Sequence, residues 1–265
     1  HPISSRPCRA YTKACRRTRA AARAADAGWF ARREMNSQHS DILIHWTSQE
    51  LVGQPLSDPN IQNAYVELLR SIYSKGLRFS CPKNLDVVVG VNSHTELPTR
   101  PIICFTELRL SQAQEHAHQY GSLGIGFRRE FLMMWGANPV FYMQSMNQGI
   151  VNTNLSGLAP LRNQTDGLDV FLSYIKPMGE PCSDQYSNYD ESEWRIVACK
   201  LGNQWPKRFV ESEDNVWFRF KPDEVLLLAL PNEATRRKCL ADPQLIDMFK
   251  NHMPMMVDTS DCQVF

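Results

Sequence analysis

The chain has 265 residues, of which 43% are hydrophobic, and its formal net charge is +1. This composition suffices for a folded core and excludes a wholly disordered chain. The charge is unevenly divided, because residues 1–34 contain nine basic and two acidic side chains, which leaves −6 for residues 35–265. This distribution excludes the overall basic surface by which proteins bind duplex DNA.

The eight cysteines are scattered, and no two have the C-x-x-C spacing of a zinc site. The longest apolar run, Val225 to Leu230, has six residues and is too short to span a membrane. No stretch near the first residue joins a basic region to an apolar one, as a secretory signal does. We therefore expect reduced thiols, no bound metal, no membrane partner and a cytoplasmic protein.

Residues 1–34 form a leader rich in Ala and Arg, with helix propensity but no apolar stripe for docking. Three interpretations stay open. The leader is a basic arm for nucleic acid or anionic lipid, a targeting peptide, or a mis-assigned start that precedes a true initiator at Met35. We exclude it from the fold and expect residues 35–265 to form a single domain.

Globular patterning begins at Asp41, where an apolar run predicts a strand over 41–47. Helical spacing then predicts a helix over 61–73, which Asn60 or Asp58 can cap and which Gly76 ends. A glycine-rich turn at 121–127 leads into a strand. Further strands are predicted at 86–91, 101–106, 139–143, 194–199, 216–220, 223–230 and 255–257. Further helices are predicted at 111–119, 128–135, 166–175, 231–240 and 243–252. The irregular order predicts an α+β fold.

Three polar residues lie at the ends of predicted apolar strands, in a chain without a Walker A, G-x-S-x-G or H-E-x-x-H motif. His45 ends the first strand, where a histidine is more often a satisfied core residue. Glu107 ends another. Glu193 follows two other acids and precedes the strand 194–199. Such a carboxylate cluster usually forms a solvated edge, but it can also hold a ribose hydroxyl or stabilise a cationic transition state.

Two histidines fall on the predicted helix over 111–119. His116 and His118 are two residues apart and face different sides of a helix, so they are weak metal ligands. His116 and Tyr120, four apart, share a helix face, which suits either plain packing or one wall of a pocket.

Several strings together resemble the abortive-infection AbiGi family, whose members are antitoxins of bacterial phage-resistance systems. The most specific are Leu110 to Phe127 and Tyr189-Asp-Glu-Ser-Glu-Trp-Arg195. The others are Ile44-His-Trp-Thr47, Pro101 to Leu108, Asn138 to Tyr142, and the leucine-rich strand that ends at Pro231-Asn-Glu233. The resemblance covers roughly residues 41–257 and implies a cognate toxin as partner.

Two further features are His45-Trp46-Thr47 on the first predicted strand and the pattern Leu68-Leu69 … Gly76-Leu77 at the end of the first predicted helix. Together they are distantly similar to ADP-ribosyltransferase-like proteins, including the DarT type. This resemblance implies a single domain with a mixed, mainly antiparallel split sheet, flanking helices and an NAD pocket. His45 would bind a ribose of NAD with support from Thr47, and Glu193 would be the catalytic carboxylate with help from Arg195. Tyr120 would stack on nicotinamide. Glu107 and His116 complete the candidate NAD-binding residues, and the acceptor would be a protein or nucleic acid.

Three functions therefore compete. An ADP-ribosyltransferase-like enzyme requires His45, Thr47 and Glu193 to line one cleft, and fails if His45 and Glu193 lie on opposite faces. A non-catalytic antitoxin predicts an exposed apolar patch or an acidic surface instead of a polar cleft. A nucleic-acid-binding module would depend on the leader, residues 1–34, and removal of the leader would abolish its binding.

Overall fold

A computed structural model of the chain describes residues 40–82, 85–88, 94–97, 99–107, 112–144, 167–178 and 192–262. The chain divides into one unit of residues His1–Gln38 and a second of residues His39–Phe265. The leader, residues 1–34, and the acids at 190 and 191 lie outside the described residues. The fold and the site below belong to the second unit.

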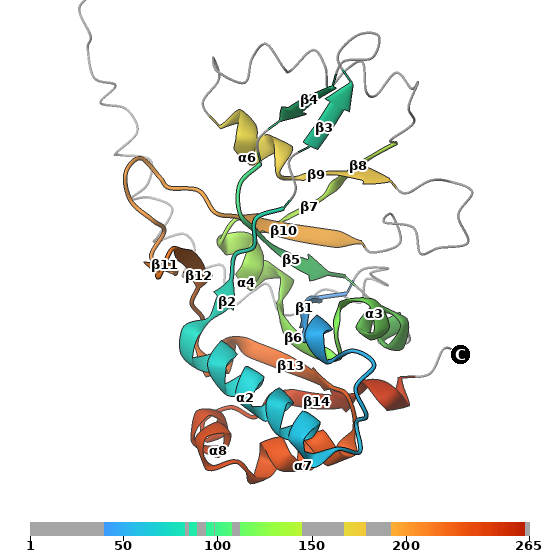
Figure 1. Ribbon diagram of the computed structural model, residues 1–265. Coiled ribbons are helices and arrows are strands. Elements are labelled where there is room, and N and C mark those ends of the chain that lie inside the picture. The colour runs from blue at the N-terminus through green and yellow to red at the C-terminus, as the bar shows by residue number, and fades with distance from the viewer. Residues whose placement is uncertain are drawn as a thin grey trace, which may run out of the picture. The chain divides into compact units, whose positions relative to one another are not determined.

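A seven-stranded sheet forms the centre of this unit, in the order β14–β13–β6–β1–β5–β10–β7 (Figure 1). Neighbouring strands are antiparallel, except for the parallel pair β13–β14. The strands are β1 (Ile42–Thr47), β5 (Ile102–Thr106), β6 (Leu123–Arg128), β7 (Asn138–Pro139), β10 (Glu193–Val197), β13 (Val225–Leu230) and β14 (Met255–Asp258). The mixed sheet and its flanking helices confirm the predicted α+β class, a class that many unrelated families share.

The described residues also form three smaller sheets. One is antiparallel, in the order β11–β12–β2, from β11 (Phe209–Ser212), β12 (Asn215–Phe218) and β2 (Leu77–Arg78). The others pair β3 (Leu85–Val88) with β4 (His94–Leu97), and β8 (Phe141–Gln144) with β9 (Ile175–Met178). The predicted helix over 166–175 is too long, because residues from Ile175 onward pair in parallel with β8. Strand pairing overrides local helix propensity there.

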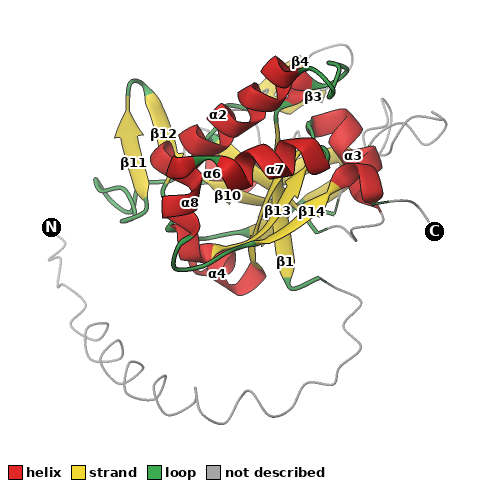
Figure 2. Cartoon of the chain, turned by 90° about the horizontal axis from the view of Figure 1, so that it is seen from below, coloured by secondary structure: helices red, strands yellow, loops and turns green. Residues whose placement is uncertain are grey.

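The helix α2 (Pro59–Lys75) begins where the sequence predicts, since the Asp58 side chain accepts a hydrogen bond from the backbone of Asn60. It packs against α7 (Glu233–Ala241) and α8 (Pro243–Phe249), as Figure 2 shows. The remaining helices are α3 (Ala113–Tyr120), α4 (Arg129–Met134), α6 (Leu168–Leu172), and the short 3-10 turns η2 (Gln49–Leu51), η6 (Pro222–Glu224) and η7 (Thr259–Asp261). None of the described helices combines the length and apolar composition that a membrane span requires.

Strand alternation gives the central sheet two different faces. Leu43 and Phe105 pack in the larger core with Leu69 of α2, on what we call the α2 face. Ile44 and Trp46 pack in a smaller core with α3, on what we call the α3 face, together with Ala113 and Ala117. Because neighbours along a strand point to opposite sides, these two cores assign each residue of β1 and β5 to a face.

The glycine-rich segment 121–127 is a turn followed by a strand, as predicted. Gly124 and Gly126 lie within β6, where they allow the side chains of neighbouring strands to pack closely. An added Cβ at Gly124 would lie 2.9 Å from Cγ2 of Ile44, and one at Gly126 would lie 2.9 Å from Cβ of Leu227. Both glycines therefore serve packing on the α3 face.

Candidate functional site

The register of β10 against β5 gathers polar side chains on the α3 face. Glu193 pairs with Thr106, and Arg195 pairs with Cys104. Facing residues of an antiparallel pair share a side of the sheet. All four therefore lie on the side that carries Ile44, since Ile44 also pairs with Thr106. We call them, with Lys176, His116, Tyr120 and Tyr142, the Glu193 cluster.

Glu193 is the centre of this cluster, and only 4% of its surface is exposed. Arg195 donates from Nε to Oε1 of Glu193 over 2.6 Å, and Lys176 donates from Nζ to Oε2 over 2.8 Å. Arg195 also donates from Nη1 to the backbone carbonyls of Ser173 and Ile175, over 2.6 and 3.2 Å. Two cations from different elements therefore hold one buried carboxylate.

The electrostatics keep Glu193 ionised. Burial alone would raise the pKa of this carboxyl, but the charge and hydrogen bond of Arg195 and the charge of Lys176 lower it overall. The neighbouring Cys104 behaves oppositely, because burial and the charge of Glu193 hold the pKa of its thiol well above the ordinary value. A thiol that stays protonated is a poor nucleophile, so Cys104 is not set up for covalent catalysis.

His116 and Tyr120 share a face of α3, as the i, i+4 spacing predicts, with ring centroids 4.6 Å apart. Nε2 of His116 lies 3.0 Å from Oγ1 of Thr106, in a hydrogen bond that ties α3 to β5. Burial, followed by the charge of Lys176, lowers the pKa of His116 to about 4. The imidazole is therefore neutral at physiological pH.

His45 and Thr47 lie on the opposite side of the sheet. His45 follows Ile44 on β1, and its ring packs against Phe105 at 5.9 Å between centroids, on the α2 face. Nδ1 of His45 donates to the backbone carbonyl of Cys104 over 2.8 Å, and burial lowers the pKa of the imidazole. The expectation that His45, Thr47 and Glu193 line one cleft is therefore wrong. The register alternates them onto different faces, and His45 is a satisfied structural histidine.

Glu107 follows β5 and links the end of this strand to β10 and to α4. Its Oε2 accepts a hydrogen bond from Nε1 of Trp194 over 3.1 Å, and its Oε1 accepts one from Nη1 of Arg129 over 3.2 Å. Trp194 neighbours Glu193 on β10 and packs against the larger core, on the α2 face. Glu107 thus stabilises the end of β5 through these two hydrogen bonds and is not one of the residues that we assign to the Glu193 cluster.

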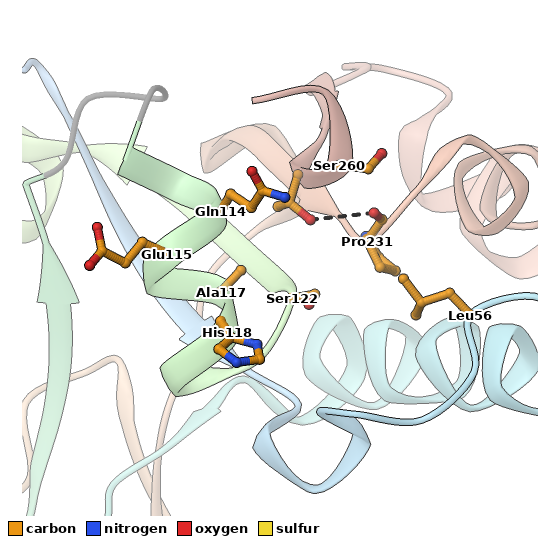
Figure 3. A pocket seen from close by; sticks show the side chains of 9 residues that line it. Leu56, Gln114, Glu115, Ala117, His118, Ser122, Pro231 and Ser260 are labelled. Atoms are coloured by element: carbon orange, nitrogen blue, oxygen red, sulfur yellow. Dashed lines mark hydrogen bonds between the residues drawn. The ribbon is translucent and has the colours of Figure 1, made fainter. Parts of the chain in front are cut away.

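A cavity of about 570 Å³ opens beside α3 (Figure 3). Gln114, Glu115 and His118 of α3 reach it, so His118 faces away from His116, as their spacing predicts. Its remaining lining residues are Leu56, Ala117, Ser122, Pro231, Thr259 and Ser260. None of the predicted NAD-site residues lines this cavity. Sequence patterns do not predict this cavity, because segments far apart in the chain meet there. Figure 3 shows one contact between them, the hydrogen bond that Thr259 donates to the backbone carbonyl of Pro231.

No metal centre emerges from the described residues, which hold no group of three or more His, Cys, Asp or Glu placed to bind an ion. The five cysteines of the described ranges, Cys81, Cys104, Cys199, Cys239 and Cys262, are all unpaired.

One family model matches the chain, over residues 89–224, and its description reads "Putative abortive phage resistance protein AbiGi, antitoxin". The match spans just over half of the 265 residues. The chain belongs to the AbiGi family. It is thereby a phage-defence protein, as the first resemblance implies. No curated protein and no solved structure matches the chain, and the distant ADP-ribosyltransferase-like resemblance finds no support here.

The part that matches AbiGi contains Glu107, Glu193 and the rest of the Glu193 cluster, but not His45 or Thr47. It also contains an exposed aromatic pair. Phe141 of β8 is 57% exposed, and Phe171 of α6 is 49% exposed. Their ring centroids are 6.1 Å apart. The AbiGi portion therefore combines a buried polar cluster with an apolar surface feature.

Proposed function

We propose that this AbiGi protein is a non-catalytic antitoxin that binds and neutralises a cognate toxin in phage defence. The observation that carries the proposal is the exposed pair Phe141–Phe171. Two large aromatic side chains in contact with each other and with solvent are costly on a free surface and typical of binding anchors.

The chemistry of the Glu193 cluster favours the same conclusion. Glu193 is tied to Arg195 and Lys176, Cys104 is held as a thiol, and His116 is hydrogen-bonded to Thr106. A catalytic carboxylate needs access to a substrate, whereas Glu193 is nearly fully buried. These groups support a structural role beneath the surface that carries the aromatic pair.

Co-expression with a candidate cognate toxin that inhibits growth tests the proposal. The wild-type chain should restore growth, and the Phe141→Ser/Phe171→Ser variant should not. The matched control is Leu201→Ser/Met255→Ser, which removes two other apolar side chains that are 75% and 51% exposed. Calorimetry with the purified pair should give a saturable complex that the first variant weakens by at least tenfold.

Two results would overturn the proposal. One is a folded Phe141→Ser/Phe171→Ser variant that binds and neutralises like the wild type. The other is inactivation of the toxin by a small fraction of an equivalent of the chain. Turnover of this kind would indicate an enzyme, because a binding antitoxin acts only in proportion to the complex that it forms.

A further inference from the structure

The sheet β11–β12–β2 presents a face with an aromatic residue among cations. Trp217 on β12 pairs with Arg78 of β2 on one side and with Val210 of β11 on the other. These three side chains share the outer face of the sheet, because the next residue, Phe218, is fully buried in the core. The row crosses two strand spacings, about 10 Å.

Two more cations flank Trp217. Lys75 ends α2, and its Nζ lies 6.0 Å from the centre of the Trp217 ring, at the outer limit of a cation–π contact. Arg219 follows β12 and donates from Nη1 to the carbonyl of Ser74 over 2.6 Å. Figure 1 shows how the end of α2 leads into β2 beside this sheet.

These cations are not neutralised by the part of the chain that the structure describes. Lys75, Arg78 and Arg219 are all exposed, and none of them forms an ion pair with a described carboxylate. Arg208 nearby is different, because it is paired with Glu224. Three uncompensated positive charges around one aromatic ring form a local basic face on a body whose net charge is negative.

We propose that this face binds single-stranded nucleic acid, with a base stacked on Trp217 and phosphates held by Lys75, Arg78 and Arg219. Charge complementarity supplies the attraction to phosphates, and an aromatic ring on a small sheet supplies a stacking platform for an unpaired base. A duplex offers no free base face, so the single strand is the better fit. The hairpin turn between β11 and β12 carries two acidic residues, Glu213 and Asp214, which repel phosphates. The single-stranded nucleic acid should therefore cross the sheet at the end that lies near α2.

The proposal rests on neither the leader nor the pair Phe141–Phe171. We would measure fluorescence anisotropy of a labelled oligothymidylate of about 20 nucleotides, an oligouridylate and a duplex of equal length. The protein is the full chain, so every variant keeps the same leader. The variants are Lys75→Gln/Arg78→Gln, whose sites are exposed, and Trp217→Ala. The charge-matched control is Arg237→Gln/Lys250→Gln, whose side chains are 75% and 59% exposed on α7 and beside α8.

The Lys75→Gln/Arg78→Gln variant should bind the single strand about tenfold more weakly than the wild type. The slope of log K plotted against log salt concentration should become shallower by about 0.7 for each cation removed. Trp217→Ala should cost about tenfold and leave that slope unchanged. The control should stay within about twofold of the wild type. Equal affinity of the double Gln variant and the wild type would overturn the proposal, as would duplex binding that is as tight as single-strand binding. The proposal would also be overturned if the same variants weakened the binding of a polyglutamate probe as much as the binding of the single strand. An acidic protein would then be the partner.

Discussion

Cys104 contacts His45 and Glu193 from opposite sides of the central sheet. Its backbone carbonyl accepts a hydrogen bond from Nδ1 of His45 over 2.8 Å. Its side chain lies on the α3 face, where the charge of Glu193 raises the pKa of the thiol. The strand β5 thus stands between the two residues that an NAD pocket would need side by side.

We therefore expect no saturable binding of NAD to this chain in titration calorimetry, even at millimolar concentration. One ligand cannot contact His45 and Glu193 at once while the register of β1 and β5 is kept. Saturable heat at millimolar NAD would contradict this expectation. If both Thr47→Ala and Tyr120→Ala weakened that heat, one site would join residues that lie on different faces.

A second prediction concerns the stability of the Glu193 cluster. Glu193→Ala leaves Arg195 and Lys176 without their shared carboxylate, and the side chains of these cations are 9% and 17% exposed. Breaking a buried ion pair in this way costs about 3–5 kcal/mol of unfolding free energy. Urea denaturation followed by tryptophan fluorescence measures the loss.

The matched control for Glu193 is Glu233→Ala, which removes a carboxylate that is 58% exposed from its pair with Arg237. That change should cost no more than about 1 kcal/mol, since solvent screens surface pairs. If both variants lost the same unfolding free energy, burial of Arg195 and Lys176 would not require the carboxylate of Glu193. The structural role assigned to Glu193 would then be wrong.

The pH dependence of stability provides a third prediction, from His116. Its pKa falls from an ordinary 6.5 to about 4 in the folded chain, because burial disfavours the imidazolium. The unfolded chain therefore binds this proton first as the pH falls. The contribution of neutral His116 is complete above pH 6.5 and is lost between about pH 6.5 and pH 4. The loss should be roughly 3 kcal/mol, since each unit of pKa shift corresponds to about 1.4 kcal/mol.

Urea titrations at several pH values test this, with His116→Gln as the variant and His118→Gln as the control. The Gln side chain at position 116 should flatten the change in stability across that window. The exposed His118 lies two residues away and lines the cavity, so its replacement should preserve the wild-type profile. Identical profiles for His116→Gln and the wild type would show that another group causes the loss.

Local patterns in the sequence were sufficient for features that depend on one element. The pairing of His116 with Tyr120 follows from helix periodicity alone, and the cap of α2 is Asp58, one of the two residues predicted for it. The opposite faces of His45 and Glu193 depend instead on the register of three strands. A shift of one residue in pairing reverses a side chain's face, and no local pattern determines that register. For the same reason the partners of Glu193 were found only in part. Arg195 is two residues away, whereas Lys176 is on β9, a strand that the sequence analysis did not predict and that begins at the last residue of the predicted helix over 166–175.

The last prediction separates backbone conformation from close approach at a glycine. Gly121 ends α3 with φ +106°, and an added Cβ would lie 2.0 Å from the carbonyl oxygen of Thr47. Gly136 has a similar φ of +91°, but nothing lies within 4 Å of its added Cβ. Both Gly→Ala changes incur the cost of a side chain at positive φ, about 1–3 kcal/mol. Only Gly121→Ala must also displace β1, so it should lose at least about 2 kcal/mol more than Gly136→Ala. Urea unfolding of the two variants side by side measures the difference. Equal losses would mean that the turn after α3 relaxes freely, and that the contact with Thr47 does not fix α3 against the sheet.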